Sequence, residues 1–379
     1  MKKFSICMSL LLTSALLISG CAKQHAEIST PSAEIPTHTA ELVSKPEASN
    51  VSTPPQHITR EISEYLAIDA DVTLPAQSQY RSYTLKTVDT DADRLFDILS
   101  PEGHSALSQT QRGDHTTYRT DDGKQLSVYD FSDISYHAYD FGGEDPQQIV
   151  RNIFYYYDLA HPQAVGHDLS FLKVADMEQY GQHLLSELGV TLEPKLEKCI
   201  TLSGDEILHY QQELLEEQTN SGISPALSEA ADTCYLEFSF SYDGLPLLGL
   251  NEPTISTDGT WGPNPDASAT VILNADGIQD FEVRYPCIPE NASEPQPVLS
   301  LENAITKLAG EYEAHTHYGQ TTVTNIWMEY IPMNRNGAVV LTPYWCFASI
   351  DASLKDQPGY LGNADRINAF TGENLAYGG

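Results

Sequence analysis

The chain has 379 residues, of which 53 are acidic and 20 basic, giving a formal net charge of −33. This charge excludes a nucleic-acid-binding surface as the main function, because such affinity comes largely from Lys and Arg side chains that neutralise phosphates. It also argues against electrostatic adhesion to an anionic membrane. At 41% hydrophobic residues, with 21 tyrosines, the chain has enough apolar material to build a core.

Residues 1–20 have the pattern of a secretory signal. Lys2 and Lys3 precede an apolar run over residues 4–18, which is too short and too often interrupted by Ser and Thr to span a bilayer. The run ends in Ile18-Ser19-Gly20-Cys21, which resembles the lipobox of bacterial lipoproteins. The resemblance implies that the Cys21 thiol receives diacylglycerol and that the signal is cut before it. An ordinary secretory signal or an uncleaved anchor is the alternative.

A lipid on Cys21 predicts a location at the extracytoplasmic face of the cell membrane. Two acyl chains suffice for stable anchoring, and no later stretch is long and apolar enough to span a bilayer. Residues 21–60 are rich in Ser, Thr and Pro and lack a periodic apolar pattern. They are therefore predicted to form a disordered linker that tethers the folded part to the membrane.

Residues 61–230 are predicted to form an N-terminal α+β domain. Alternating apolar residues predict strands over 67–74, 80–87 and 134–139, and a hairpin of 116–119 with 126–129. A short helix is expected over 91–99. Three more helices are expected: one begins at Asp145-Pro146, one ends before Gly189, and one follows the capping-box pair Ser203 and Glu206. Strands followed by helices favour α+β over alternating βαβ units.

Residues 231–379 are predicted to form a second, C-terminal α+β domain with antiparallel sheets. Two hairpins are expected, 234–240 with 245–250 and 270–273 with 281–285, each about an Asp-Gly turn. Ser300 is expected to cap a helix that extends to Tyr312. Strands over 322–331 and 339–350 follow, and residues 366–374 end in a turn.

The end of the chain carries a resemblance to a known family. The resemblance rests on four segments: a strand with Phe281 and Val283, the helix 300–312, the strand 341–345 and the turn 367–373. With these, residues 276–375 resemble the C-terminal module of YycH/YycI-type regulatory proteins of Gram-positive bacteria and, more distantly, PepSY-like domains. In that comparison Trp345 is a core anchor, and Gly372 supplies a tight turn.

The whole chain is also similar to uncharacterised clostridial lipoproteins of the Firmicutes. These resemblances imply an extracytoplasmic protein that binds another protein, in the regulatory case a sensor kinase. The regulators usually keep an N-terminal transmembrane helix, whereas here a lipid replaces it. A mechanism that works through helix contacts inside the bilayer is therefore not expected.

Catalytic motifs are missing from the sequence. Ser170-Phe-Leu-Lys173 matches the S-x-x-K of penicillin-recognising enzymes, but no Lys-Thr-Gly element follows it. There is no G-x-S-x-G, H-E-x-x-H, Walker loop or G-x-G-x-x-G. The sequence therefore predicts no enzyme activity and no cofactor.

Two groups of potential metal ligands are weak. His315 and His317 form an H-x-H pair, which needs at least one more ligand from elsewhere to bind a metal. Asp89, Asp91 and Asp93 imitate the start of a calcium loop, but its glycine position holds Arg94. A solvated loop and an acidic helix N-terminus explain these two groups better, so no metal site is predicted.

Trp261 lies in a polar, proline-rich stretch and is the candidate ligand-binding residue. On a loop its ring can stack on a sugar or a peptide, with Asp258, Asn264 and Asp266 as hydrogen-bonding partners. The alternative is that Trp261 folds back over the sheet.

Four cysteines follow Cys21 in the chain and are candidates for disulfide bonds. Cys199 with Cys234, and Cys287 with Cys346, would each close a loop within one predicted domain. Buried free thiols are the alternative, and both interpretations stay open.

Three functions can be compared on these observations. We expect a non-catalytic binding or regulatory lipoprotein that acts on an envelope protein partner. A cell-envelope hydrolase, or a glycan- or peptide-binding protein that uses the Trp261 loop, is the alternative. A solute-binding component of a transporter ranks last, because its lobes need alternating βα units.

Overall fold

The computed structural model describes residues 56–101, 103, 107–113, 115–129, 133–139, 146–161, 166–217, 227–247, 268–284, 287–314, 319–335, 338–351 and 363–375. The signal sequence, Cys21 and most of the predicted linker lie outside these residues. The last part of that linker is corrected, because residues 56–60 belong to a strand. That strand is mostly exposed, so it lacks the apolar alternation by which strands are recognised.

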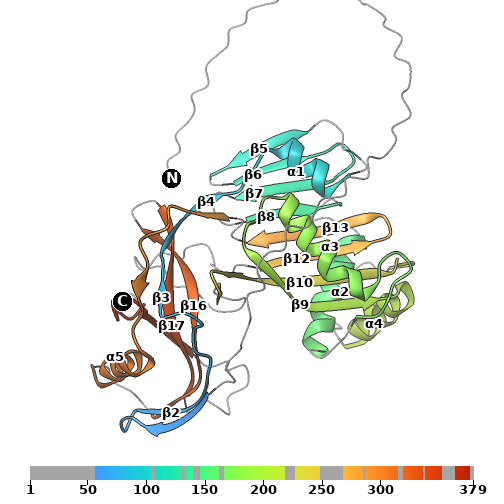
Figure 1. Ribbon diagram of the computed structural model, residues 1–379. Coiled ribbons are helices and arrows are strands. Elements are labelled where there is room, and N and C mark those ends of the chain that lie inside the picture. Colours follow the sequence, from blue (N-terminus) through green and yellow to red (C-terminus); the bar gives the residue numbers. More distant parts are fainter. Residues whose placement is uncertain are drawn as a thin grey trace, which may run out of the picture. The chain divides into compact units, whose positions relative to one another are not determined.

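Two large sheets form the fold, and Figure 1 shows both. The seven-stranded sheet contains β1 (Gln56–Glu61), β2 (Leu66–Val72), β16 (Thr321–Arg335), β17 (Ala338–Asp351), β4 (Tyr83–Thr87), β14 (Cys287–Glu290) and β18 (Asn363–Asn368). The nine-stranded sheet contains β11 (Leu245–Pro246), β10 (Thr233–Tyr242), β12 (Ser268–Asn274), β13 (Gly277–Arg284), β8 (Asp133–His137), β7 (Gln125–Tyr129), β6 (His115–Arg119), β5 (Ser108–Arg112) and β9 (Glu193–Leu202). A small ribbon pairs β3 (Gln79–Tyr80) with β15 (Gln296–Pro297).

Five helices accompany the sheets in the described part of the chain: α1 (Ala92–Leu99), α2 (Pro146–Ala160), α3 (Val174–Glu187), α4 (Gly204–Glu217) and α5 (Leu301–Ala314). Neighbouring strands pair antiparallel, except that β16 runs parallel to β2. The predicted α+β class with antiparallel sheets and packed helices is confirmed. The resemblance of the C-terminal module to regulatory domains stays a prediction.

The sheets do not divide the chain at residues 230 and 231, where a domain boundary was expected. Strand β9 pairs with β10 across this point, and β8 pairs with β13. In the seven-stranded sheet, β2 and β4 from the start of the chain pair with β16 and β17 from its end. The expected boundary followed the order of local elements, whereas sheet pairing here joins segments that are distant in sequence.

The two faces of the nine-stranded sheet are covered by different helices. Along β10, Cys234 and Leu236 share a core cluster with α1 and α3, whereas Tyr235 packs with α2 and α4. Because side chains of a strand alternate between its faces, α1 and α3 lie on one face and α2 and α4 on the other. The ring of Phe96 in α1 packs edge to face on the ring of Tyr136 on β8, with the two ring centroids 5.9 Å apart.

Polar side chains cap the N-termini of α1 and α4, as the sequence predicted. Asp91 caps α1, since its Oδ1 accepts a hydrogen bond from the backbone N–H of Arg94 at 2.9 Å. The acidic group around Asp91 thus begins a helix, as expected. Ser203 and Glu206 exchange side-chain to backbone hydrogen bonds at the start of α4. Gly189, with φ 85°, follows the end of α3.

The seven-stranded sheet is built around Trp345. This residue is 2% exposed, and its Nε1–H donates to the carbonyl oxygen of Leu299 at 3.0 Å. It shares the core cluster with α5 residues such as Ile305 and Leu308. Gly372 has φ 75°, and a Cβ there would come within 2.9 Å of the Lys307 side chain. The expected roles of a core anchor and of a tight turn are confirmed.

The cysteines whose side chains are described are free thiols. Cys199, Cys234 and Cys346 have no disulfide partner in this part of the chain. The sequence left both disulfides and free thiols open for these residues, and the structure shows free thiols. Because Cys346 is a free thiol, the disulfide with Cys287 that was left open is not formed.

Candidate functional site

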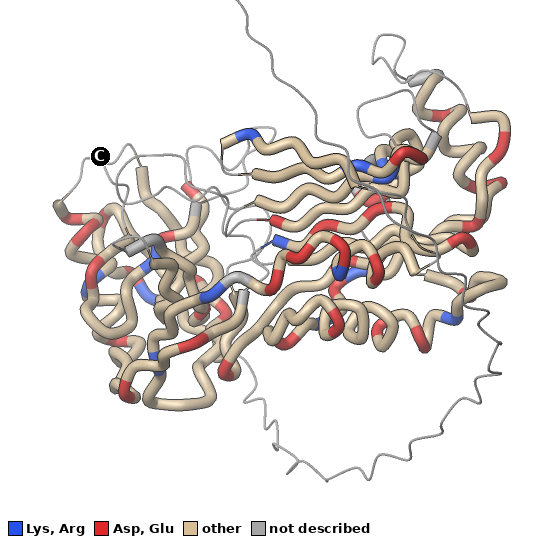
Figure 2. Tube along the Cα trace, turned by 90° about the horizontal axis from the view of Figure 1, so that it is seen from above, with Lys and Arg blue, Asp and Glu red and all other residues tan. Residues whose placement is uncertain are grey.

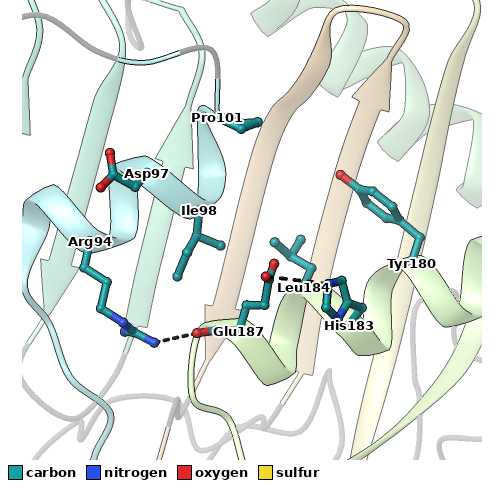
Figure 3. Close-up of a pocket in the computed structure, with 8 residues that line it drawn as sticks. All are labelled: Arg94, Asp97, Ile98, Pro101, Tyr180, His183, Leu184 and Glu187. Atoms are coloured by element: carbon teal, nitrogen blue, oxygen red, sulfur yellow. Dashed lines mark hydrogen bonds and ion pairs between the residues drawn. The ribbon is translucent and has the colours of Figure 1, made fainter. Parts of the chain in front are cut away.

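A pocket of about 520 Å³ lies on the nine-stranded sheet, between α1 and α3 (Figure 3). Its volume falls in the range of small-ligand sites. From α1 and the residues that follow it come Arg94, Asp97, Ile98 and Pro101, and from α3 come Tyr180, His183, Leu184 and Glu187. Apolar groups and charged groups therefore share the lining.

Arg94 is the most informative residue of this pocket. Its Nη2–H donates to the backbone carbonyl oxygen of Glu187, at the end of α3. That contact supplies a cation to a helix end whose last turn carries no basic residue of its own. The Arg94 Nη1 atom is buried and has no hydrogen-bond partner among the described residues. A buried donor without a partner costs about 1–3 kcal/mol, so an acceptor that reached it would stabilise the bound state.

Other polar groups surround this guanidinium. His183 Nε2 lies 3.5 Å from Glu187 Oε1, and both side chains are exposed. Burial, with the nearby charge of Glu187, raises the pKa of Tyr180, so its hydroxyl stays protonated and can donate a hydrogen bond. The pocket thus offers a guanidinium and a phenol to acceptors, and carboxylates to cationic groups.

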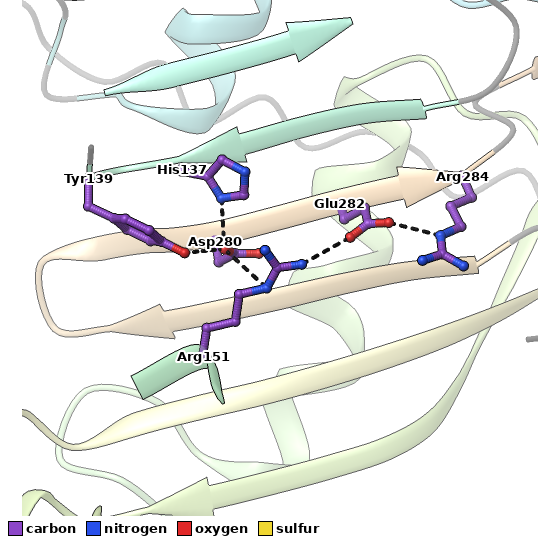
Figure 4. Close-up of polar contacts among 6 residues, drawn as sticks. All are labelled: His137, Tyr139, Arg151, Asp280, Glu282 and Arg284. Carbon is purple, nitrogen blue, oxygen red and sulfur yellow. Dashed lines mark hydrogen bonds and ion pairs between the residues drawn. The ribbon is translucent and has the colours of Figure 1, made fainter. Parts of the chain in front are cut away.

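A second polar group lies on the opposite face of the same sheet, around Asp280 (Figure 4). Asp280 is 2% exposed. Its Oδ2 accepts the Tyr139 hydroxyl at 2.7 Å and lies 2.8 Å from His137 Nδ1. Arg151 of α2 places its Nε 3.7 Å from the same oxygen. A buried carboxylate therefore has two hydrogen-bonding partners and a nearby cation.

The group continues along β13 through Glu282. Arg151 Nη2 donates to Glu282 Oε2 at 3.3 Å, and Arg284 Nε donates to Glu282 Oε1 at 2.8 Å. Burial, with the Asp280 charge, raises the pKa of the Tyr139 phenol. Burial lowers the pKa of the Arg151 guanidinium, but the Asp280 charge and other neighbours outweigh it and raise that pKa overall.

These contacts fasten α2 to the sheet. The residues drawn in Figure 4 include an imidazole next to a carboxylate, but none of them is a serine, threonine or cysteine nucleophile. His137 is 4% exposed, so its ring is shielded from a substrate. We therefore interpret the Asp280 group as a structural network, and the α1–α3 pocket as the candidate site.

The predicted site residues are not among those that form this pocket. Trp261, Asp258, Asn264 and Asp266 lie outside the described residues, as do Cys21 and the His315–His317 pair. Lys173, the end of the S-x-x-K match, is the residue before α3, where Asp168 accepts a hydrogen bond from the Val174 N–H at 3.0 Å. That match therefore marks the start of a helix.

Sequence reasoning missed the pocket because its walls come from two helices far apart in the chain. Each helix was expected, and each has an apolar side that faces the sheet. Which two helices lie next to each other follows from the strand order, which local patterns do not reveal. A basic residue in the first turn of an acidic helix, Arg94, was the available signal.

The described residues contain neither a metal-binding group of His, Cys, Asp and Glu side chains nor a helix able to cross a membrane. Among them, no group of three or more His, Cys, Asp or Glu side chains is arranged to hold a metal ion. None of the helices in that part of the chain combines the length and the apolar composition that crossing a bilayer requires.

Comparison with known proteins yields a likeness in structure. No family model and no curated protein matches this chain. Among solved structures, the chain is similar to the crystal structure of an uncharacterised protein from Eubacterium rectale, with a TM-score of 0.52 and 14% sequence identity. The alignment covers 85% of this chain and 94% of that chain. At this identity, the likeness shows a shared fold alone.

Proposed function

We propose that this protein is a lipoprotein, held by a lipid on Cys21 at the extracytoplasmic face of the cell membrane, that binds an envelope protein. The basic start, the apolar run and Ile18-Ser19-Gly20-Cys21 support the anchor. The resemblance of residues 276–375 to regulatory modules supports a protein partner. The absence of catalytic motifs from the sequence supports binding as the activity.

The unpartnered Nη1 of Arg94 in the α1–α3 pocket is the observation that carries this proposal. An extended peptide segment carries the kinds of chemical group that this pocket can bind. Its backbone carbonyls or acidic side chains can accept from Arg94, and its basic side chains can pair with Asp97 or Glu187. Its apolar side chains can pack on Ile98 and Leu184, which form apolar parts of the lining.

The acidic surface favours a partner with basic groups. Figure 2 shows acidic residues along strands, loops and helices, with few basic residues among them. Complementary charge speeds the encounter of two proteins more than it strengthens their complex. We therefore expect the partner to carry basic residues beside the segment that enters the pocket.

A photo-crosslinking experiment on intact cells tests the proposal. A photoreactive residue replaces His183 at the pocket, and in a matched control it replaces His209 on α4. Both histidines are exposed and pair with a glutamate one helical turn away, but they lie on opposite faces of the sheet. We expect a crosslinked envelope protein from position 183 alone.

Two arginine variants complete the experiment. Arg94→Ala should remove the crosslink formed from position 183, whereas Arg112→Ala, on the exposed strand β5, should leave it unchanged. Circular dichroism establishes that both variants fold. Equal crosslinking from positions 183 and 209, or a crosslink that persists in Arg94→Ala, would contradict binding at this pocket.

A further inference from the structure

Three sulfur atoms meet between α3 and the strands β9 and β10. Met177 Sδ lies 3.1 Å from Cys199 Sγ and 3.5 Å from Cys234 Sγ. Both thiols therefore lie within hydrogen-bonding reach of the same thioether sulfur. Met177 and Cys234 are 0% exposed, whereas Cys199 is partly exposed. This sulfur cluster, Met177, Cys199 and Cys234, is separate from the α1–α3 pocket.

The strand register disfavours a disulfide at this place. Cys199 stands opposite Leu236, and Cys234 stands opposite Thr201, so the two cysteines are diagonal neighbours on one face. The Cα atoms of diagonal neighbours in antiparallel strands are about 7–8 Å apart. A disulfide usually spans a Cα separation of about 4.4–6.8 Å. Closing the bond would therefore require the backbone to move.

A metal ion bridges such a pair with less movement. With metal–sulfur bonds of about 2.3 Å, two thiolates on one ion lie roughly 4 Å apart, about twice the length of a disulfide bond. Met177 reaches the same point from the helix above the sheet, so three sulfur donors converge there.

We propose that Met177, Cys199 and Cys234 form a binding site for a soft monovalent metal ion of the Cu(I) class. Thiolate and thioether sulfurs select such ions over hard cations. Each thiol that becomes a ligand loses its proton to the solvent, so binding strengthens as the pH rises. No electron is transferred in this step, because the ion enters and leaves as Cu(I).

The surroundings of Cys199 suit it as the first ligand. Cys199 is partly exposed, whereas Cys234 and Met177 are fully buried, so an ion that arrives from solvent meets the Cys199 sulfur first. A Cβ at Gly166 would come within 2.7 Å of Cys199 Sγ, so glycine leaves the room that this thiol occupies. The negative charge of the chain raises the local concentration of cations.

A competition titration tests the site. The full-length protein, reduced and freed of metal, is titrated anaerobically with Cu(I) held by a coloured chelator. We expect wild-type protein to take up about one Cu(I) per chain from the chelator. Cys199→Ser, Cys234→Ser and Met177→Leu should each raise the dissociation constant by about tenfold or more, since even outer-shell changes cost that much.

The control variant is Cys346→Ser, which removes another buried free thiol, on β17 of the other sheet. It should bind Cu(I) as wild-type protein does. Met177→Leu keeps both thiols and nearly the same core volume, so its loss of affinity cannot come from unfolding. X-ray absorption of the bound ion should show a shell of sulfur atoms only. Failure of wild-type protein to take Cu(I) from the chelator would overturn the proposal, as would equal affinity in Met177→Leu or a loss in Cys346→Ser matching that in Cys199→Ser.

Discussion

Replacing Trp345 by alanine should unfold the seven-stranded sheet at a markedly lower denaturant concentration. The side chain is 2% exposed and lies on β17 between Met328 of β16 and Ile367 of β18. Removing a buried tryptophan side chain costs about 3–5 kcal/mol through lost burial and the cavity that remains. The hydrogen bond to the Leu299 carbonyl oxygen is lost as well, and such a bond contributes about 1 kcal/mol.

The conservative variant separates the two contributions. Trp345→Phe keeps an aromatic ring in the core but loses the Nε1–H donor. Its cost should therefore be about 1–2 kcal/mol, from a hydrogen bond worth about 1 kcal/mol and a small loss of buried area. Tyr155→Ala is the matched surface control, since Tyr155 is 64% exposed. It should change stability by no more than about 0.5 kcal/mol.

Urea unfolding followed by far-UV circular dichroism measures these differences without relying on tryptophan fluorescence. With an m-value of about 3 kcal/mol/M, Trp345→Ala should lower the midpoint by about 1–1.7 M. A midpoint for Trp345→Ala within the range of Tyr155→Ala would refute the role of Trp345 as the anchor of this sheet.

Three further predictions concern the anchor, the buried network and a helix cap. Cys21→Ala should release the protein into the medium or leave an uncut precursor, which fractionation and mass measurement detect; normal processing with unchanged membrane retention would refute the lipid. Asp280→Ala should lower the free energy of unfolding by about 3–5 kcal/mol, because it removes the buried carboxylate that contacts His137, Tyr139 and Arg151, whereas Asp276→Ala at an exposed turn should have little effect. Hydrogen bonds from Ser203 lower the pKa of Glu206 below its ordinary 4.5, so its contribution to stability is present above pH 4.5 and is lost as the pH falls through the lowered pKa. Glu206→Gln should therefore flatten the acid limb of a stability–pH curve, and an unchanged limb would exclude this contribution.

Local elements could be predicted from the sequence because their signals are local. The caps Asp91 and Ser203, the glycine after α3 and the Asp-Gly hairpins each act within a few residues. Strand β9 was missed because its exposed first half, with Pro194 and three charged residues, hides the apolar alternation of its second half. Strand β1 was assigned to the linker for the same reason.

The sheets and the candidate site could not be predicted, because they depend on contacts between distant segments. The pairing of β2 with β16 has no local signature, because the two strands lie near opposite ends of the described chain. The pocket exists because α1 and α3 lie side by side on one face. The sulfur cluster likewise joins a helix residue to two strands, and only the strand register places its members on the same side.

The pairing of the first strands with the last has a consequence for biosynthesis. Strands β2 and β4 each pair with one earlier-made strand, β1 and β14, but their second neighbours in the seven-stranded sheet are β16 and β17, which are made near the end of the chain. Until then their backbone edges stay open to other extended chains, which makes the nascent protein prone to aggregate. A topology with such high contact order also folds slowly. Truncating the chain before β16 should thus cost the seven-stranded sheet most of its pairing partners, while the hairpin of β6 and β7 needs nothing downstream to form.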